Sequence, residues 1–127
     1  MKTLKTVQFK DNLVYQTRAG RDRISVADAK DAIWFQYIDG EEVLGICSLL
    51  PITGNGGRLK AVWVKPEHRG AGNGTAMVEA LMAFARDRGA DRLEVIAYNP
   101  KFYEARGFKK VGNPRPNGTQ RLVKEPV

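Results

Sequence analysis

The sequence predicts a mixed α/β fold built on a mostly antiparallel sheet of about six or seven strands. Segments rich in β-branched and aromatic residues alternate with turn residues along most of the chain, which predicts strands joined by hairpins. One longer segment has apolar residues at helical spacing and is bounded by glycines. A strand precedes this helix and another follows it, so the sheet should contain a central β-α-β crossover with flanking helices.

The N-terminal quarter has the least regular pattern. Residues 6–17 predict a strand that is interrupted at Asp11-Asn12, and residues 18–23 predict a basic turn. Residues 25–32 favour a helix of about one or two turns, for which Ser25 is the candidate N-cap. The first helical region is therefore predicted to be short.

Three strands are expected next, in hairpin order. Residues 33–38 and 43–50 are rich in β-branched and aromatic side chains, and the loop Asp39-Gly40-Glu41-Glu42 joins them. A turn-rich segment at residues 51–57 leads to a third strand at residues 59–64. These three consecutive strands should pair antiparallel.

The crossover follows the third of these strands. Four apolar residues fall on one face of a helix that Gly89 ends: Met77, Leu81, Phe84 and Ala85. Residues 93–98 form a short apolar strand, which should lie parallel to residues 59–64. The remaining chain predicts a short helix and two further strands, at residues 101–106, 108–111 and 120–124.

Length and composition fit one domain over residues 1–127. The chain has 127 residues, of which 43% are hydrophobic and 28% charged, so one core should form without disulfides or metal. No apolar run approaches the ~20 residues of a membrane helix, and a cytoplasmic protein is expected. Cys47 and His68 are the only residues of their types, which excludes an internal disulfide and argues against a structural metal site.

The chain is strongly basic, and the charge is unevenly distributed. Its net charge of +7 favours a polyanionic partner such as nucleic acid or a phosphorylated cofactor. Residues 31–57 carry four acidic side chains and no basic one, whereas residues 58–127 carry fourteen basic and seven acidic side chains. Two faces of different charge are therefore expected.

A glycine-rich loop precedes the long helix. Gly70, Gly72 and Gly74 would let the backbone approach a phosphate, and the first turn of the helix offers free N–H groups. The loop lacks the Gly-Lys-Ser/Thr of a P-loop, and Asp91 precedes its strand instead of ending it as in the dinucleotide fingerprint. The loop predicts an anion-binding turn, with a purely geometric role for the glycines as the alternative.

Two motifs together resemble the GNAT superfamily of CoA-dependent N-acyltransferases. Residues 64–77 are similar to its pyrophosphate-binding motif, Arg/Gln-x-x-Gly-x-Gly/Ala, with Arg69, Gly72 and Gly74 in the defining places. Residues 99–108, Asn-Pro-Lys-Phe-Tyr-Glu-Ala-Arg-Gly-Phe, are similar to the family's Asn…Phe/Leu-Tyr-x-x-x-Gly-Phe segment. The resemblance covers residues 59–111 and extends less closely to residues 32–57.

The resemblance implies a GNAT-like sheet and a binding site for acetyl-CoA as the acyl donor. The pyrophosphate would lie on the backbone N–H groups of the glycine loop, and the pantetheine arm would follow the edge of the preceding strand. Asn99 would be a contact on the cofactor side, with a turn residue that ends the strand before Pro100 as the alternative. The cofactor-binding residues implied are Val62, Trp63, Val64, Arg69, Gly70, Ala71, Gly72, Asn73, Gly74, Thr75 and Asn99.

The resemblance also implies catalytic roles. Tyr103 is the candidate general acid for the departing thiolate, and the alternative for Tyr103 is a core aromatic with a satisfied hydroxyl. Many relatives carry a glutamate as general base in the strand before the glycine loop, where this chain has Lys60. The base is therefore not assigned, and His68 lies in a run that the family usually places on the surface or the cofactor side.

Three functions fit these observations. The favoured one is an acetyl-CoA-dependent N-acetyltransferase in which an amine attacks the thioester directly. The second is a related enzyme that modifies a nucleic-acid base, as the Mom-type DNA modification proteins do. The basic net charge and the shortened first helical region favour this alternative. The third is a non-catalytic module that binds CoA or a partner protein. In each case we expect the chain to be a monomer or a homodimer.

Overall fold

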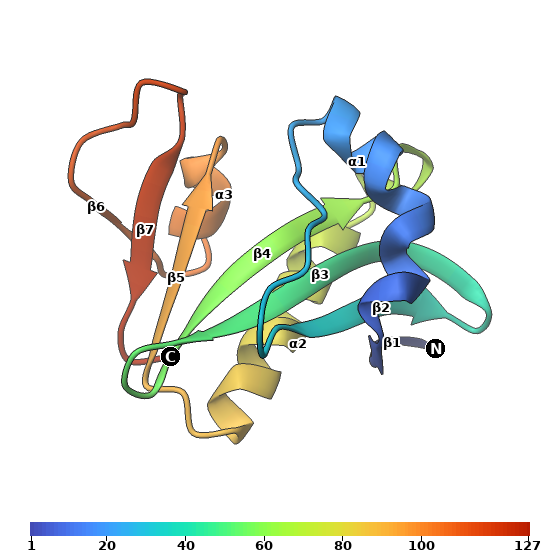
Figure 1. Ribbon diagram of the computed structural model, residues 1–127, viewed down its shortest axis with the longest axis horizontal. Coiled ribbons are helices and arrows are strands. Elements are labelled where there is room, and N and C mark those ends of the chain that lie inside the picture. Colours follow the sequence, from blue (N-terminus) through green and yellow to red (C-terminus); the bar gives the residue numbers. More distant parts are fainter.

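The computed structural model describes residues 1–127 and contains one seven-stranded sheet in the order β1-β2-β3-β4-β5-β7-β6 (Figure 1). All neighbouring strands pair antiparallel except β4 and β5, which are parallel. The strands are β1 Lys2–Val7, β2 Ile33–Asp39, β3 Glu42–Ile52, β4 Gly56–Val64, β5 Arg92–Ala97, β6 Lys109–Val111 and β7 Gln120–Lys124. The helices are η1 Phe9–Tyr15, α1 Gln16–Arg21, η2 Pro66–His68, α2 Asn73–Asp87 and α3 Pro100–Glu104.

The mixed sheet, its central crossover and the C-terminal elements confirm the predicted fold. Helix α2 connects the parallel strands β4 and β5, and Gly89 follows it with a φ of +90°, as expected for a C-terminal glycine. Three of the four residues of the predicted apolar face of α2, Met77, Leu81 and Ala85, are fully inaccessible, and Phe84 is partly buried against the same core. None of the helices is long and apolar enough to span a membrane.

The predicted elements between residues 6 and 32 are wrong. The first strand is Lys2–Val7, and residues 9–21 continue as η1 and α1 instead of a strand and a basic turn. Asp11 begins these turns, because its carboxylate accepts a hydrogen bond from the backbone N–H of Gln8 at 3.0 Å. Asn12 is fully buried and donates to the carbonyl of Phe35, so Asp11-Asn12 is the start of a helical segment and not a break in a strand.

Residues 25–32 do not form the predicted helix. Residues 24–29 have no regular secondary structure, and residues 29–32 form a turn in which the N–H of Ala32 donates to the Ala29 carbonyl. The side chain of Gln16 donates to the Val26 carbonyl at 2.7 Å. Trp34 donates through Nε1 to Asp28 at 2.9 Å. These hydrogen bonds to residues outside the segment take the place of the intrahelical bonds.

The sheet has a core on each face. The larger one, on the face covered by α2 and α3, contains Phe35, Cys47 and Tyr103 among its buried residues. The smaller one lies under η1, α1 and the segment that follows α1, and is built on Trp34, Ile46 and Trp63. We call these two sides of the sheet the α2 face and the α1 face.

Candidate active site

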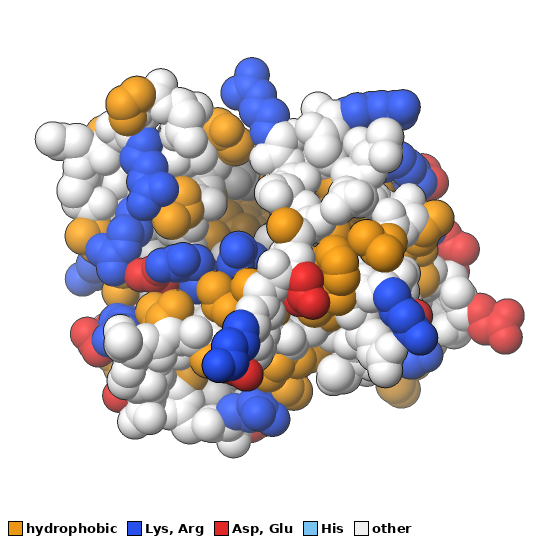
Figure 2. Space-filling view, in the orientation of Figure 1, with side chains coloured by type: hydrophobic (Ala, Val, Ile, Leu, Met, Phe, Trp, Pro, Cys, Tyr) orange, Lys and Arg blue, Asp and Glu red, His pale blue; other side chains and the backbone are white.

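The parallel strands β4 and β5 separate and leave a cleft between them. They are paired only where residues 56–59 face residues 92–95, and they diverge toward their C-terminal ends (Figure 1). The cleft has a volume of about 910 Å³ and is lined by the separated parts of both strands, the glycine loop, α3 and residues 22–25. In Figure 2 the surface is hollowed between the part carrying β5 and β7 and the chain that follows α1.

A β-bulge in β4 marks the point of separation. Ile46 faces Trp63 whereas Ser48 faces Lys60, so β4 contains one residue more than β3 between these pairs. Ala61 lies in this bulge with a φ of +54°, which is uncommon for a residue with a side chain. No glycine, proline or asparagine occurs at the bulge, so the sequence analysis did not predict it.

Beyond the bulge, backbone groups of β4 point into the cleft. The N–H of Lys65 bonds to the carbonyl of Leu44 on β3. Because alternate residues of a strand direct their polar groups to opposite sides, those of Val64 point away from β3 and toward the β5 side. The Val64 carbonyl there accepts a hydrogen bond from Nε of Arg69 at 2.9 Å. Val62, two residues earlier, is predicted to offer its N–H in the same direction.

The glycine loop ends the cleft at the N-terminus of α2. Gly70 and Gly72 have φ values of +80° and +81°, and nothing lies within 4 Å of where their Cβ atoms would be. The helix starts at Asn73, and its first intrahelical bond is donated by Ala76 to the Gly72 carbonyl. The preceding N–H groups are thus free to bind an anion beside the cleft.

Arg69 belongs to a network that connects the glycine loop with the segment after α1. Its guanidinium donates to the carboxylate of Asp22 at 2.7 Å, and Trp63 donates to the same carboxylate at 2.8 Å. The hydrogen bonds from Trp63 and Arg69 hold the pKa of Asp22 below its normal value. Asp22 thereby fixes residues 22–25 at the rim of the cleft. The three residues of this network are too far apart in sequence for their contacts to be predicted.

Helix α3 places Tyr103 in the wall of the cleft. Arg106 holds this region against α2, since it donates to the Thr75 hydroxyl at 2.8 Å and covers the ring of Phe102. Tyr103 packs edge-on between Phe102 and Phe108, with centroid distances of 5.0 and 5.7 Å. Only 4% of Tyr103 is exposed, and burial, aided by the nearby Cys47, raises the pKa of its phenol.

The structure brings together eleven of the twelve predicted site residues, and Ala71 alone does not line the cleft. Asn73 contributes its backbone, because its side chain donates to the His68 carbonyl and accepts from Lys2. Asn99 lies at the mouth of the cleft and precedes α3. The sequence analysis did not name Phe102 as a site residue, although it lies in the same motif as Tyr103, and it missed Thr119 and residues 22–25, which share no motif with the others.

The remaining candidate residues have other surroundings. His68 is outside the lining of the cleft and bonds to Glu42 at 2.9 Å. Cys47 is fully buried, and burial raises the pKa of its thiol, so it is a core residue and not a nucleophile. Lys60 lines the cleft and makes no ion pair.

Glu94 joins β4, β5 and β7 below the cleft. Its side chain is 4% exposed and forms ion pairs with Arg58 and, at 2.8 Å, with Arg121. Burial works to raise the pKa of Glu94, but the hydrogen bonds and charges of the two arginines outweigh it and hold the pKa below its normal value. The carboxylate is therefore ionised at neutral pH, and each of its two oxygens is bonded to an arginine.

Replacing Glu94 with Gln should lower the free energy of unfolding at pH 7 by about 2 kcal/mol, because two arginines lose their carboxylate. A carboxyl with a lowered folded-state pKa stabilises the fold above its unfolded pKa of about 4.3, and this stabilisation disappears as the pH falls through the folded-state pKa. Urea unfolding at decreasing pH should show the two proteins converging. A difference that stays constant with pH would contradict this role. Glu104→Gln, at an exposed pair with Lys110, is the control.

Comparisons with known proteins agree on one family. The family model described as the acetyltransferase (GNAT) family matches residues 4–108. No curated protein matches the chain significantly. The fold is similar to that of a Lactobacillus plantarum protein assigned as an N-acetyltransferase, with a TM-score of 0.81, 18% identity and 99% of each chain covered.

Two further solved structures share this fold. The ribosomal-protein-S18-alanine N-acetyltransferase from Escherichia coli has a TM-score of 0.80 at 16% identity, over 100% of this chain and 95% of the other. Rv2747 from Mycobacterium tuberculosis, crystallised with CoA, has a TM-score of 0.79 at 17% identity, over 98% and 99% of the two chains. At sequence identities of 16% to 18%, these similarities establish a shared fold and nothing more.

Proposed function

Because the chain belongs to the GNAT family of acetyltransferases, we propose that it transfers the acetyl group of acetyl-CoA directly to an amine. The observation that carries this proposal is the cleft between β4 and β5, which ends at the free N–H groups of α2. A long ligand with a phosphorylated end fits such a cleft, because the phosphates bind at the helix N-terminus and the arm lies between the strands. The lone buried Cys47 agrees with the cytoplasmic location that we propose.

The residues of the cleft fit the parts of CoA. Gly70 and Gly72 leave open space above the backbone, which a pyrophosphate needs in order to reach the N–H groups of Asn73, Gly74 and Thr75. The pantetheine arm is an amide chain, and the outward-pointing backbone groups of Val62 and Val64 can bond to it as a neighbouring strand would. Acetyl-CoA supplies an activated acyl group as a thioester.

In the transfer, a C–N bond forms between the amine and the carbonyl carbon, and the C–S bond breaks. A backbone N–H of β4 near the bulge polarises the carbonyl oxygen. Tyr103 supplies the proton that the thiolate takes up, and it regains a proton from solvent. Because burial raises the pKa of Tyr103, its phenol stays protonated at neutral pH but is a weaker acid than a thiol, so the transfer requires the phenol to lie beside the departing sulfur.

No carboxylate of the cleft is suited to act as general base. Asp22 is the only acidic residue that lines it, and its Oδ2 accepts hydrogen bonds from both Trp63 and Arg69, which hold its pKa below the normal value and make it a weak base. The proton lost by the attacking amine therefore goes to water. The rate should accordingly rise with pH as a larger fraction of the acceptor becomes the neutral amine.

The test of this function is a calorimetric titration of the protein with acetyl-CoA and with CoA, followed by an assay of thiol release with a panel of amines. We expect micromolar binding of both ligands and formation of an N-acetyl product. Absence of binding to either ligand would overturn the assignment. Binding without turnover of any amine would instead favour the non-catalytic module.

A further inference from the structure

Two cations that line the cleft on the α1 face have no acidic partner. Lys60 lies on this face beside Arg58, because both alternate with Leu59, which packs in the core of the α2 face. Arg23 follows α1, and its guanidinium is 5.3 Å from the ring centroid of Tyr98. Neither forms an ion pair. Ser48, which faces Lys60 across the strands, keeps a buried hydroxyl without any hydrogen-bond partner.

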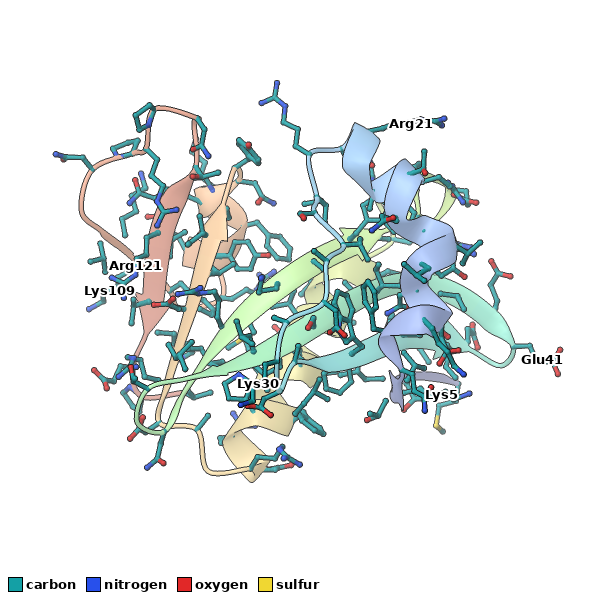
Figure 3. All side chains as sticks on the ribbon, viewed as in Figure 1. Lys5, Arg21, Lys30, Glu41, Lys109 and Arg121 are labelled. Carbon is teal, nitrogen blue, oxygen red and sulfur yellow. The ribbon has the colours of Figure 1, made fainter.

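The carboxylates near these cations are already occupied. Asp22 bonds to Trp63 and Arg69, and Glu94 forms ion pairs with both Arg58 and Arg121. The two arginines carry one positive charge more than the carboxylate of Glu94 neutralises, and this excess adds to the positive electrostatic potential of the α1 face. Figure 2 shows Lys and Arg side chains gathered around one acidic side chain where β5 and β7 lie, and Figure 3 shows Lys109 and Arg121 beside each other there.

These cations lie on the side of the sheet away from the proposed phosphate site. Val62 and Val64 pack against the core of the α2 face, and a Cβ on Gly74 of the glycine loop would lie 3.7 Å from Val64. Lys60 points to the α1 face instead. The pyrophosphate thus has its own site, and the charges of Arg23 and Lys60 remain available to the second substrate.

Arg23 is held in an unusual backbone conformation. Its φ is +62°, although it is neither glycine nor asparagine. The neighbouring Asp22 is fixed by Arg69 and Trp63, and the Arg23 side chain covers Tyr98, which directly follows β5. Strained residues that line a cleft are typical of binding sites. In this conformation the Arg23 guanidinium extends from residues 22–25, on one wall of the cleft, to Tyr98 on the opposite wall.

We propose that the acceptor is a small amine that also carries an anionic group, a carboxylate or a phosphate, held by Arg23 and Lys60. The inference rests on the proposed acetyl transfer and specifies its second substrate. The cleft volume of about 910 Å³ is in the range of small-molecule sites, and residues 22–25 form one of its walls. Tyr98 is the only exposed aromatic residue, and Arg23 covers it, so the face offers no stacking platform for nucleic-acid bases.

The first experiment measures anion binding without turnover. Glutarate and inorganic phosphate are titrated calorimetrically into protein saturated with CoA, which fills the phosphate site at α2. We expect millimolar binding of at least one anion, weakened about 10-fold or more by the double change Arg23→Gln and Lys60→Met. The matched control is Lys5→Gln, a cation on β1 at the other end of the sheet (Figure 3). Binding of neither anion, or equal binding by the double variant, would overturn the inference.

The second experiment compares amines that differ in one group. Phosphoethanolamine is paired with ethanolamine, and β-alanine with propylamine, and spermidine serves as the cationic amine. We expect kcat/KM to be about 10-fold or more higher for an anionic member than for its neutral partner, and this ratio to fall in the double variant but not in Lys5→Gln. Preference for spermidine, or acetylation of a single-stranded oligonucleotide in place of the anionic amines, would contradict the inference.

The two proposals fail in different ways. If CoA does not bind to the wild-type protein, the acetyl transfer itself is wrong. If CoA binds and amines are acetylated without any preference for anionic ones, only the inference about the acceptor is wrong. Acetyl-CoA titrations of the double variant show whether its phosphate site is intact, and we expect its Kd for acetyl-CoA to stay within about 3-fold of wild type.

Discussion

The Gly74→Asp variant should lose acetyl-CoA binding while remaining folded. Gly74 is the second residue of α2, and an added Cβ would make ordinary contacts, 3.7 Å from Val64 and 3.9 Å from Phe102. A carboxylate there would stabilise the helix N-terminus by about 0.3–1 kcal/mol. The same carboxylate would repel the pyrophosphate by roughly 3 kcal/mol for a charge at ~5 Å and an effective dielectric constant of ~20. We expect Kd to rise about 100-fold or more.

Gly74→Asn is the matched control, because it has the same shape without the charge. Calorimetry with acetyl-CoA should show a much smaller loss of affinity for Gly74→Asn, and thermal unfolding should show an unchanged or higher midpoint for Gly74→Asp. If the Asp and Asn variants bind equally well, the phosphates do not lie at the N-terminus of α2. The charge difference between these two variants thus tests the position of the cofactor and not only its presence.

Tyr103→Phe is expected to lower kcat by about 100-fold or more, because the thiolate loses its proton donor. The hydroxyl of Tyr103 has no hydrogen-bond partner in the protein, and the ring packs edge-on against Phe102 and Phe108. The phenylalanine ring should keep these contacts, so stability and the Kd for CoA should change little. Steady-state thiol release together with a CoA titration separates the two effects.

A suitable control is Tyr37→Phe, since Tyr37 is also buried but lies on β2 outside the cleft. Its kcat should remain close to that of wild type. A kcat for Tyr103→Phe within about 3-fold of wild type would remove Tyr103 as the acid and leave it as a core aromatic. In that case the thiolate would take its proton from water.

The motifs of the C-terminal part could be predicted because their information is local. The spacing of Met77, Leu81 and Ala85 specifies one face of a helix, and glycines at 70, 72 and 74 specify a turn before it. Strand, loop, helix and strand in this order leave the right-handed crossover as the dominant topology. The position of Tyr103 beside the loop follows from the same unit, which explains why most of the predicted site residues meet in one cleft.

The N-terminal part could not be predicted in the same way. Residues 9–21 have no strong helical periodicity, and their turns are stabilised by contacts such as Phe9 with Trp34 at 5.0 Å and Tyr15 with Trp63 at 6.0 Å. The irregular conformation of residues 25–32 depends on hydrogen bonds such as that from Trp34 to Asp28. Tertiary contacts therefore override the weak local preference of this segment.

The sequence by itself determined the crossover, the glycine loop, the candidate acid and the family, because each depends on residues close together along the chain. Only the tertiary structure decided the bulge at Ala61, the Asp22 link between Trp63 and Arg69, and the unpartnered cations on the α1 face. The Asp22 link joins residues that are 41 and 47 positions apart, and the bulge depends on how β3 pairs with β4. A pattern along the chain does not encode such contacts, since they arise only when the sheet brings the segments together.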